Sequence, residues 1–153
     1  MSGQSYQVRE VDWRSHGAAL EALRKAVFCA EQGVPEALEI DGRDPDCVHV
    51  AAYAGGQLIG TARLLPSARV GRMAVAARWR RRGVGRALLE ALLGEARRRG
   101  FTGISLAAQV EAVGFYQRCG FHTVSGVYME AGIPHRDMRI DWGQVSADPE
   151  TSL

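Results

Sequence analysis

The sequence contains little cysteine, and the cysteines do not have the spacing of a disulfide framework or a metal site. Its three cysteines, Cys29, Cys47 and Cys119, are widely separated, and no Cys-x-x-Cys pair occurs among the 153 residues. An odd number of scattered thiols argues against a disulfide framework and against a zinc site. We therefore expect no bound metal and a reducing, cytoplasmic location.

Two further absences exclude a membrane and nucleic acid as expected partners. No apolar run approaches the length that crosses a bilayer, and residues 1–5 do not resemble a signal peptide. The net charge is only +2, which is far from the broad basic surface that general nucleic-acid binding favours. We expect a small-molecule partner instead.

The residues that are present suit a single globular domain over residues 1–153. Hydrophobic residues make up 46% of the chain and charged residues 24%, which is ordinary for a soluble protein of sufficient length to bury a core. Alternating or apolar runs predict strands at 6–11, 48–53, 58–65, 68–75, 103–108, 123–128 and 134–141.

Helices are predicted over three stretches, one that ends near residue 31 and two at 87–97 and 110–119. Asp12 or Ser15 is placed to cap the first helix, and Gly120 to end the last. Strands that flank helices in this way predict an α/β sheet covered on both faces. Residues from Ser146 onward are predicted to form a frayed tail.

An acidic stretch follows the first predicted helix. It contains five carboxylates, Glu36, Glu39, Asp41, Asp44 and Asp46. We expect them to be solvated on a loop, or to attract a cationic amine. His49 lies in a predicted strand, and we expect a structural role for it.

The most informative stretch runs from Arg78 to Arg86, between the strand at 68–75 and the helix at 87–97. It holds five arginines in nine residues, together with Gly83 and Gly85. A glycine has no Cβ, so the backbone of this turn can approach a ligand closely. The helix behind it offers unpaired N–H groups, and arginines supply bidentate donors for phosphate. The pattern therefore predicts capture of a pyrophosphate.

The segment Arg80-Arg-Arg-Gly83-Val-Gly85 resembles the acyl-CoA-binding motif of the GCN5-related N-acetyltransferase (GNAT) family, Arg/Gln-x-x-Gly-x-Gly/Ala. The resemblance implies the acyl-CoA N-acyltransferase fold, a mixed sheet of about six or seven strands flanked by helices. It implies acetyl-CoA as the co-substrate and no metal. The cofactor-binding residues that it implies are Met73, Ala74, Val75, Arg80, Arg81, Arg82, Gly83, Val84, Gly85, Arg86, Gln109 and Tyr116.

The second half of the chain extends the resemblance. Gln109-x-x-Ala112-x-x-x-Tyr116-x-x-x-Gly120-Phe121 is similar to a family pattern that begins with asparagine, which glutamine replaces here. The pattern implies that Tyr116 is the acid that protonates the leaving thiolate. The alternative is that Tyr116 has only a structural role, as a half-buried packing residue on a helix.

The general base and the acceptor pocket are less clearly marked. Two stretches, 27–35 and 130–138, resemble a branch of small uncharacterised bacterial acetyltransferases without an agreed substrate. Glu31 is one candidate base, with Gln32 beside it on the acceptor side, and His135 is the competing candidate. The alternatives are a helix-end carboxylate and a histidine on the surface of a strand. The amine acceptor, the use of longer acyl groups and the oligomeric state, with a homodimer as one option, stay open.

Two other functions compete with an N-acetyltransferase. The residues Arg24, Phe28, Glu39, Asp41, Asp44 and Arg63 resemble the first half of acyl-homoserine-lactone synthases, which share the fold but use acyl carrier protein and S-adenosylmethionine. Those enzymes are not expected to have the Arg80–Gly85 loop, so they rank second. The other competitor is a non-catalytic acyl-CoA-binding module, which would bind CoA without turnover.

Overall fold

The computed structural model describes residues 5–142, and these fall into two compact units that divide between residues 92 and 93. The predicted frayed tail from Ser146 therefore lies outside the described residues, as do four of the five residues compared with a signal peptide. No helix in the described range 5–142 is long and apolar enough to cross a membrane.

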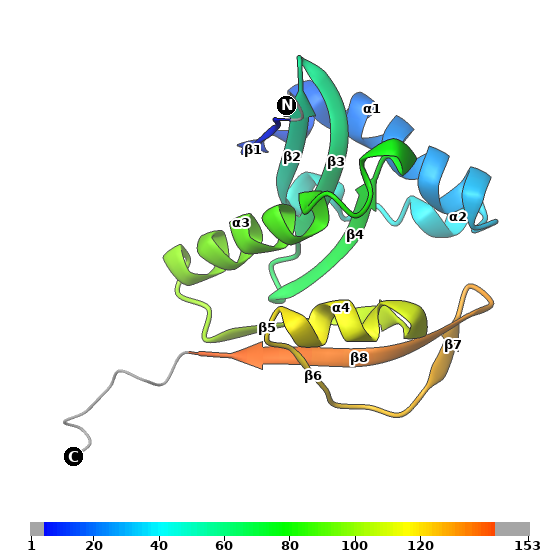
Figure 1. Ribbon diagram of the computed structural model, residues 1–153, viewed down its shortest axis with the longest axis vertical. Coiled ribbons are helices and arrows are strands. Elements are labelled where there is room, and N and C mark those ends of the chain that lie inside the picture. The colour runs from blue at the N-terminus through cyan, green and yellow to red at the C-terminus, as the bar shows by residue number, and fades with distance from the viewer. Residues whose placement is uncertain (1–4, 143–153) are drawn as a thin grey trace. The chain divides into compact units, whose positions relative to one another are not determined.

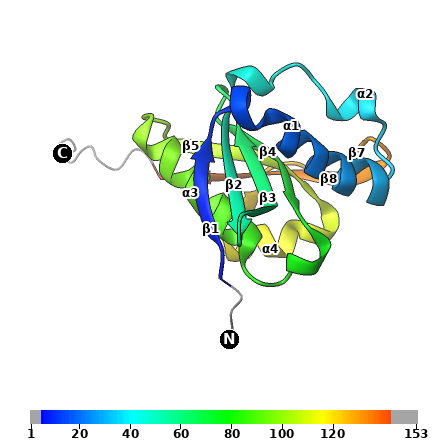
Figure 2. The same ribbon diagram turned by 90° about the horizontal axis from the view of Figure 1, so that it is seen from above.

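The first unit contains four antiparallel strands in sequential order (Figures 1 and 2). They are β1 (Gln7–Val11), β2 (Val48–Ala54), β3 (Gln57–Leu64) and β4 (Arg69–Val75). The turn between β2 and β3 consists of Gly55 and Gly56, whose φ angles of 57° and 81° favour glycine. All four predicted strands of this half are thus confirmed, with bounds that differ by one or two residues.

Helix α1 (Trp13–Arg24) begins at Asp12, whose Oδ2 accepts a hydrogen bond of 2.9 Å from the backbone N–H of Ser15. The helix packs against β3 and β4 and buries Leu20 together with Val11 and Ala51. It continues as a π-helix, η1 (Lys25–Glu31), which sequence periodicity does not predict. π-Helical turns are rare in proteins, but those that occur are often found at functional sites.

The acidic stretch is not a simple loop, because it contains α2 (Glu36–Glu39) and the short helix η2 (Asp44–Asp46). After β4, the short helix η3 (Ala77–Trp79) leads to α3 (Val84–Arg98). The first turns of α3 lie on β3 at Gly60, where an added Cβ would come within 3.0 Å of Leu88 and 3.1 Å of Val84. Glycine at position 60 therefore lets the beginning of α3 approach the sheet.

The second unit is built around β8 (Ile133–Asp141). This strand pairs antiparallel with β5 (Gly103–Gln109), β6 (His122–Thr123) and β7 (Tyr128–Glu130). Between β5 and β6, η4 (Val110–Ala112) and α4 (Val113–Arg118) form the predicted helix, which ends before Gly120 at a φ of 101°. The buried side chains of Leu106 and Met138 are opposite each other in the β5–β8 register.

The prediction of one strand over residues 123–128 is wrong, because the segment divides into the ends of β6 and β7. The cause lies at Ser125, whose hydroxyl Oγ accepts a 2.8 Å hydrogen bond from the backbone N–H of Asp137. The Ser125 carbonyl accepts another bond, 3.1 Å long, from Nε of Arg136. Side chains thus replace backbone pairing at this point, as serine commonly does at turns.

Candidate active site

The arginine-rich stretch adopts the predicted order of strand, turn and helix. Arg81 and Gly83 have φ angles of 65° and 85°, and the carbonyl of Gly83 accepts a 3.0 Å bond from Ala87 in the first turn of α3. A Cβ at Gly83 would lie 3.4 Å from the hydroxyl of Tyr6. The turn therefore leads directly into a helix whose first N–H groups are available for an anion.

Arg80 joins three parts of the predicted site. Its Nε donates a 2.9 Å hydrogen bond to the carbonyl of Val75, and its Nη2 donates a 2.8 Å bond to Oε1 of Glu31. The Arg80 and Glu31 side chains are 41% and 40% exposed, so solvent weakens their attraction. The structure thus brings together the end of the π-helix, the end of β4 and the start of the turn.

Two other arginines of the turn also interact within the protein. The Arg82 guanidinium carbon lies 5.2 Å from the centroid of the Trp79 ring, and Nε of Arg86 donates a 3.2 Å bond to Glu90 on the same helix. The Arg86–Glu90 pair is exposed and weak. A phosphate could therefore take the place of Glu90 beside Arg86 at little cost.

Strand β4 contains a bulge between Gly71 and Ala74. Arg63 pairs with Gly71 and Thr61 with Ala74, so two residues of β4, Arg72 and Met73, stand opposite one residue of β3. Arg72 has a φ of 50°, a left-handed conformation that costs a non-glycine residue about 1–2 kcal/mol. Bulges re-aim neighbouring groups and are common next to active sites.

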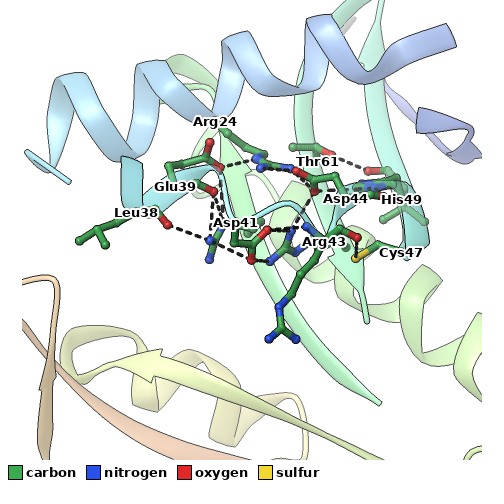
Figure 3. A network of polar contacts seen from close by, with 12 residues as sticks. Arg24, Leu38, Glu39, Asp41, Arg43, Asp44, Cys47, His49 and Thr61 are labelled. Carbon is green, nitrogen blue, oxygen red and sulfur yellow. Dashed lines mark hydrogen bonds and ion pairs between the residues drawn. The ribbon is translucent and has the colours of Figure 1, made fainter. Parts of the chain in front are cut away.

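A buried network of charges links the acidic stretch to α1 and β3 (Figure 3). Arg24 donates a 2.6 Å bond to Glu39 and bonds of 2.8 and 3.0 Å to the two carboxylate oxygens of Asp44. Arg63 also donates a 2.9 Å bond to Oδ1 of Asp44. All four side chains are at most 5% exposed. The prediction of a solvated acidic loop is therefore wrong for Glu39 and Asp44.

The outer part of the network is half-buried. Asp41 accepts hydrogen bonds from Arg63 and from Arg72, and Arg72 also lies 3.5 Å from Glu39. The bond from Arg63 holds the pKa of Asp41 well below its usual range. Burial by itself would raise the pKa of Asp44, but the bonds from Arg24 and Arg63 lower it. Three arginines thus balance three carboxylates, which is the condition for burying them.

His49 lies at the inner end of the network. Its Nε2 donates a 2.9 Å bond to the carbonyl of Asp44, and its ring stacks on Trp13 with 4.8 Å between centroids. Burial lowers the pKa of His49, so the ring is neutral at pH 7 and its role is structural. Donor atoms of Asp44, Cys47 and His49 lie within 4.8 Å of one another, but Arg24 and Arg63 already occupy the carboxylate, which disfavours a cation there.

The remaining predicted residues lie in the second unit. Tyr116 is on α4, with ring centroids of Phe115 and Phe121 at 5.0 and 5.9 Å, and burial raises its pKa to about 12. Gln109 stands opposite His135 in the β5–β8 register. The buried His135 donates from Nδ1 to the carbonyl of Ile133 at 2.7 Å. This bond leaves the lone pair of a neutral imidazole on Nε2.

The sequence matches the acetyltransferase (GNAT) domain family over residues 10–142. This chain belongs to the GNAT family. The protein ElaA of Escherichia coli (strain K12) is 36% identical to this GNAT domain over an alignment of 129 residues. The alignment covers 78% of this chain and 84% of ElaA. The identity extends over most of both chains, so the relationship concerns the whole domain.

Solved structures show the same fold. The crystal structure of Escherichia coli ElaA has a TM-score of 0.81 and 31% sequence identity, and the alignment covers 90% of this chain and all of that one. An acyl-CoA N-acyltransferase from Pseudomonas aeruginosa has a TM-score of 0.77 and 32% identity, with 90% and 99% of the chains covered. The predicted fold class is therefore confirmed.

The organisation of the charged residues in this GNAT domain is not evident from the sequence. The spacing of Arg24, Glu39, Asp41, Asp44 and Arg63 suggests a resemblance to another enzyme class, whereas the structure assembles these residues into one network. The bulge at Arg72 was not predicted either, because arginine gives no signal of a left-handed backbone. The predicted pairing partners of Arg80 were phosphate oxygens, and the structure adds Glu31 and Val75.

Proposed function

We propose that this GNAT domain transfers the acetyl group of acetyl-CoA to a primary amine by direct attack. The observation that supports this most strongly is the continuous arrangement of the β4 bulge, the Gly83 turn and the start of α3. It offers backbone donors along a strand and a cluster of anion-binding groups directly after it. A thioester attached to a pyrophosphate needs both.

In the proposed reaction, the amine nitrogen attacks the thioester carbonyl, a C–N bond forms and the C–S bond breaks. Backbone groups of Met73, Ala74 and Val75 serve the pantetheine and the developing oxyanion. Arg80 to Arg86 hold the pyrophosphate, and Gln109 contacts the pantetheine. Tyr116 gives its proton to the departing thiolate, and the proton that the amine loses goes to a base or to water.

Between the two candidate bases, the contacts favour His135. Glu31 already accepts a bond from Arg80, and taking a proton would weaken that pair. In a neutral imidazole, donation of Nδ1–H to the Ile133 carbonyl makes Nε2 of His135 the hydrogen-bond acceptor. We therefore propose His135 as the base, with Glu31 and Gln32 on the acceptor side. With a responsive amine, His135→Gln should lower kcat more than Glu31→Gln does.

The test of the proposed function is a panel of primary amines with acetyl-CoA, in which the release of free thiol is measured. We expect turnover with at least one class: small amines, amino sugars, polyamines, drugs or peptide N-termini. A parallel thermal-shift titration with CoA separates binding from catalysis, since ligand at a hundred times its dissociation constant stabilises by about 2.7 kcal/mol. If CoA produces no shift and no amine is acetylated, the proposal is wrong.

Two competing functions have distinct signatures in the same assay. The assembled network of Arg24, Asp41, Asp44 and Arg63 favours an acyl-homoserine-lactone-synthase-like acyltransferase, which would use acyl carrier protein and S-adenosylmethionine. A non-catalytic module would show the CoA shift without any thiol release. We place the enzyme in the cytoplasm because Cys29, Cys47 and Cys119 form no disulfide within the described residues 5–142. A homodimer is compatible with this proposal and is testable by sedimentation.

A further inference from the structure

The side chain of Arg72 does not extend into solvent from β4 but is bonded to the acidic stretch. Its Nη2 donates bonds of 3.2 and 3.0 Å to the carbonyls of Leu38 and Glu39, and its Nε donates a bond of 3.2 Å to the Glu39 carbonyl. Nη2 also contacts Oδ2 of Asp41 at 3.3 Å. One guanidinium thus holds two consecutive carbonyls and a carboxylate of a segment more than thirty positions away in the sequence.

The segment that Arg72 grips is itself anchored. Glu39 is bonded to Arg24 and Asp41 to Arg63, and both arginines are almost completely buried. The 38–41 segment is therefore a fixed support in the first unit (Figure 3). The residues that anchor this segment belong to α1 and β3. Displacement of the Arg72 side chain would therefore disturb the whole network.

Arg72 is the residue of the bulge that has the unfavourable left-handed backbone conformation. The φ of 50° occurs at the residue directly before Met73, opposite the register shift in β3. A left-handed non-glycine residue persists only where surrounding contacts hold it. Here, those contacts are the bonds from the residue's own side chain to the 38–41 segment.

From these contacts we infer that Arg72 is a positioning residue for acyl transfer, whose side chain holds the β4 bulge and so orients the backbone groups of residues 73–75. The inference rests on the proposed function, in which these backbone groups serve the thioester. Arg72 itself touches neither substrate nor cofactor in this scheme. The fork of the guanidinium explains the residue type, since a lysine ammonium cannot hold two carbonyls and a carboxylate in one plane.

The experiment compares Arg72→Gly and Arg72→Ala with wild type. Glycine accepts a positive φ readily, so Arg72→Gly removes the side-chain bonds but does not disfavour the left-handed backbone of the bulge. Arg72→Ala removes the same bonds and leaves a residue that disfavours this backbone conformation. We expect both variants to speed hydrogen exchange at the amides of residues 73–75. With a responsive amine, kcat should fall about tenfold or more, while KM for acetyl-CoA and the dissociation constant of CoA stay within about twofold, because the Gly83 turn is untouched.

Two further variants sharpen the test. Arg43→Ala removes the same charge from the acidic stretch, but the Arg43 side chain points away from the network in Figure 3, so exchange and kcat should match wild type. Arg72→Lys retains the charge and should recover part of kcat. Wild-type exchange at residues 73–75 and wild-type kcat in Arg72→Gly would overturn the inference. If wild type acetylates no amine, the proposed function fails, and the exchange data still decide whether Arg72 holds the bulge.

Discussion

At the scale of single residues, the site is defined by partners that the motif does not reveal. Arg80 stands first in the Arg-x-x-Gly-x-Gly motif, yet two of its nitrogens donate to Val75 and Glu31. The alternative to a catalytic His135 was a histidine on the surface of a strand, but the residue is buried and bonded to the carbonyl of Ile133. The Tyr116 ring makes edge contacts with the rings of Phe115 and Phe121. The neighbours of each of these side chains therefore determine its orientation before the reaction.

The proposed role of Tyr116 gives the first prediction. Because burial raises its pKa to about 12, the hydroxyl stays protonated throughout an assay range of about pH 6–9. Tyr116→Phe should lower kcat and kcat/KM together by about 10²-fold, the low end for a general acid, with KM for acetyl-CoA unchanged.

The measurement is steady-state kinetics with the amine found in the panel, from pH 6 to about pH 9. The loss should be largest at high pH, where water and buffer are the poorest substitute donors. Thermal unfolding serves as the control, since phenylalanine preserves the ring contacts. Wild-type turnover of the Phe variant at every pH would make Tyr116 a packing residue.

At the scale of elements, the turn before α3 joins the end of the bulged strand to the start of a helix. Its backbone is left-handed at Arg81 and at Gly83. The π-helix η1 ends at Glu31, which Arg80 holds, so the turn is also tied to the end of the first helical segment. The Arg80 side chain therefore joins the end of η1, which is distant in sequence, to the end of β4 and the turn that follows it.

The second prediction tests this turn. Gly83→Val should abolish CoA binding, since a branched side chain would stand between the N–H groups and the pyrophosphate. The matched control is Gly100→Val, because Gly100 has a φ of 84°, close to the 85° of Gly83, and lies where an added Cβ meets nothing within 4 Å. Both variants should lose similar stability from backbone strain.

Isothermal titration with CoA distinguishes the two glycine variants. Gly100→Val should bind as wild type does once the folded fraction is taken into account. Equal weakening in both variants would show that strain, and not the approach of a ligand, explains the effect at position 83.

At the scale of the whole molecule, the charge network is the feature with the largest consequence for stability. It ties the acidic stretch to α1, β2, β3 and β4 in the first unit. Buried ion pairs contribute little net stability compared with apolar groups, but breaking one leaves a charge without compensation. The network therefore makes this unit sensitive both to single substitutions and to acid.

The third prediction concerns Arg24, the most buried arginine. Arg24→Met should lower the free energy of unfolding by about 3–5 kcal/mol, since Glu39 and Asp44 stay buried without their partner. Urea unfolding followed by circular dichroism measures this loss. Arg43→Ala, exposed on the same stretch, should change stability by less than about 0.5 kcal/mol. Equal effects of the two substitutions would mean that the network does not stabilise the fold.

The fourth prediction is that stability falls in acid in two stages. The pKa of His49 is lowered from 6.5 in the folded state, so below pH 6.5 the unfolded chain binds a proton that the folded chain does not, and folding weakens. The pKa values of Asp41 and Asp44 are lowered from 3.8. Their contribution is present above pH 3.8 and is lost as the pH falls toward their folded values.

The urea midpoint measured from pH 7 to about pH 3 follows both stages. His49→Gln keeps a donor for the Asp44 carbonyl but cannot be protonated, so it should flatten the decline that begins below pH 6.5 and leave the loss near pH 4 intact. An identical slope in His49→Gln and wild type would exclude His49 as the cause of the first stage.

The sequence by itself determined the features that depend on neighbouring residues. Hydrophobic periodicity predicted six strands near their observed positions, and the seventh prediction, at 123–128, was wrong. Asp12 caps α1, Gly120 follows α4, and the Arg80–Gly85 motif predicted the turn and the family. These features are local because backbone geometry and capping are decided within a few residues.

Tertiary structure alone decided the features that require distant partners. An acidic stretch that looks solvated becomes buried because Arg24 and Arg63, from α1 and β3, come to lie against it. Arg72 adopts a left-handed backbone because the 38–41 segment accepts its side chain. Whether a charge is buried depends on where its counter-charge lies in space, and the order of residues along the chain does not contain that distance.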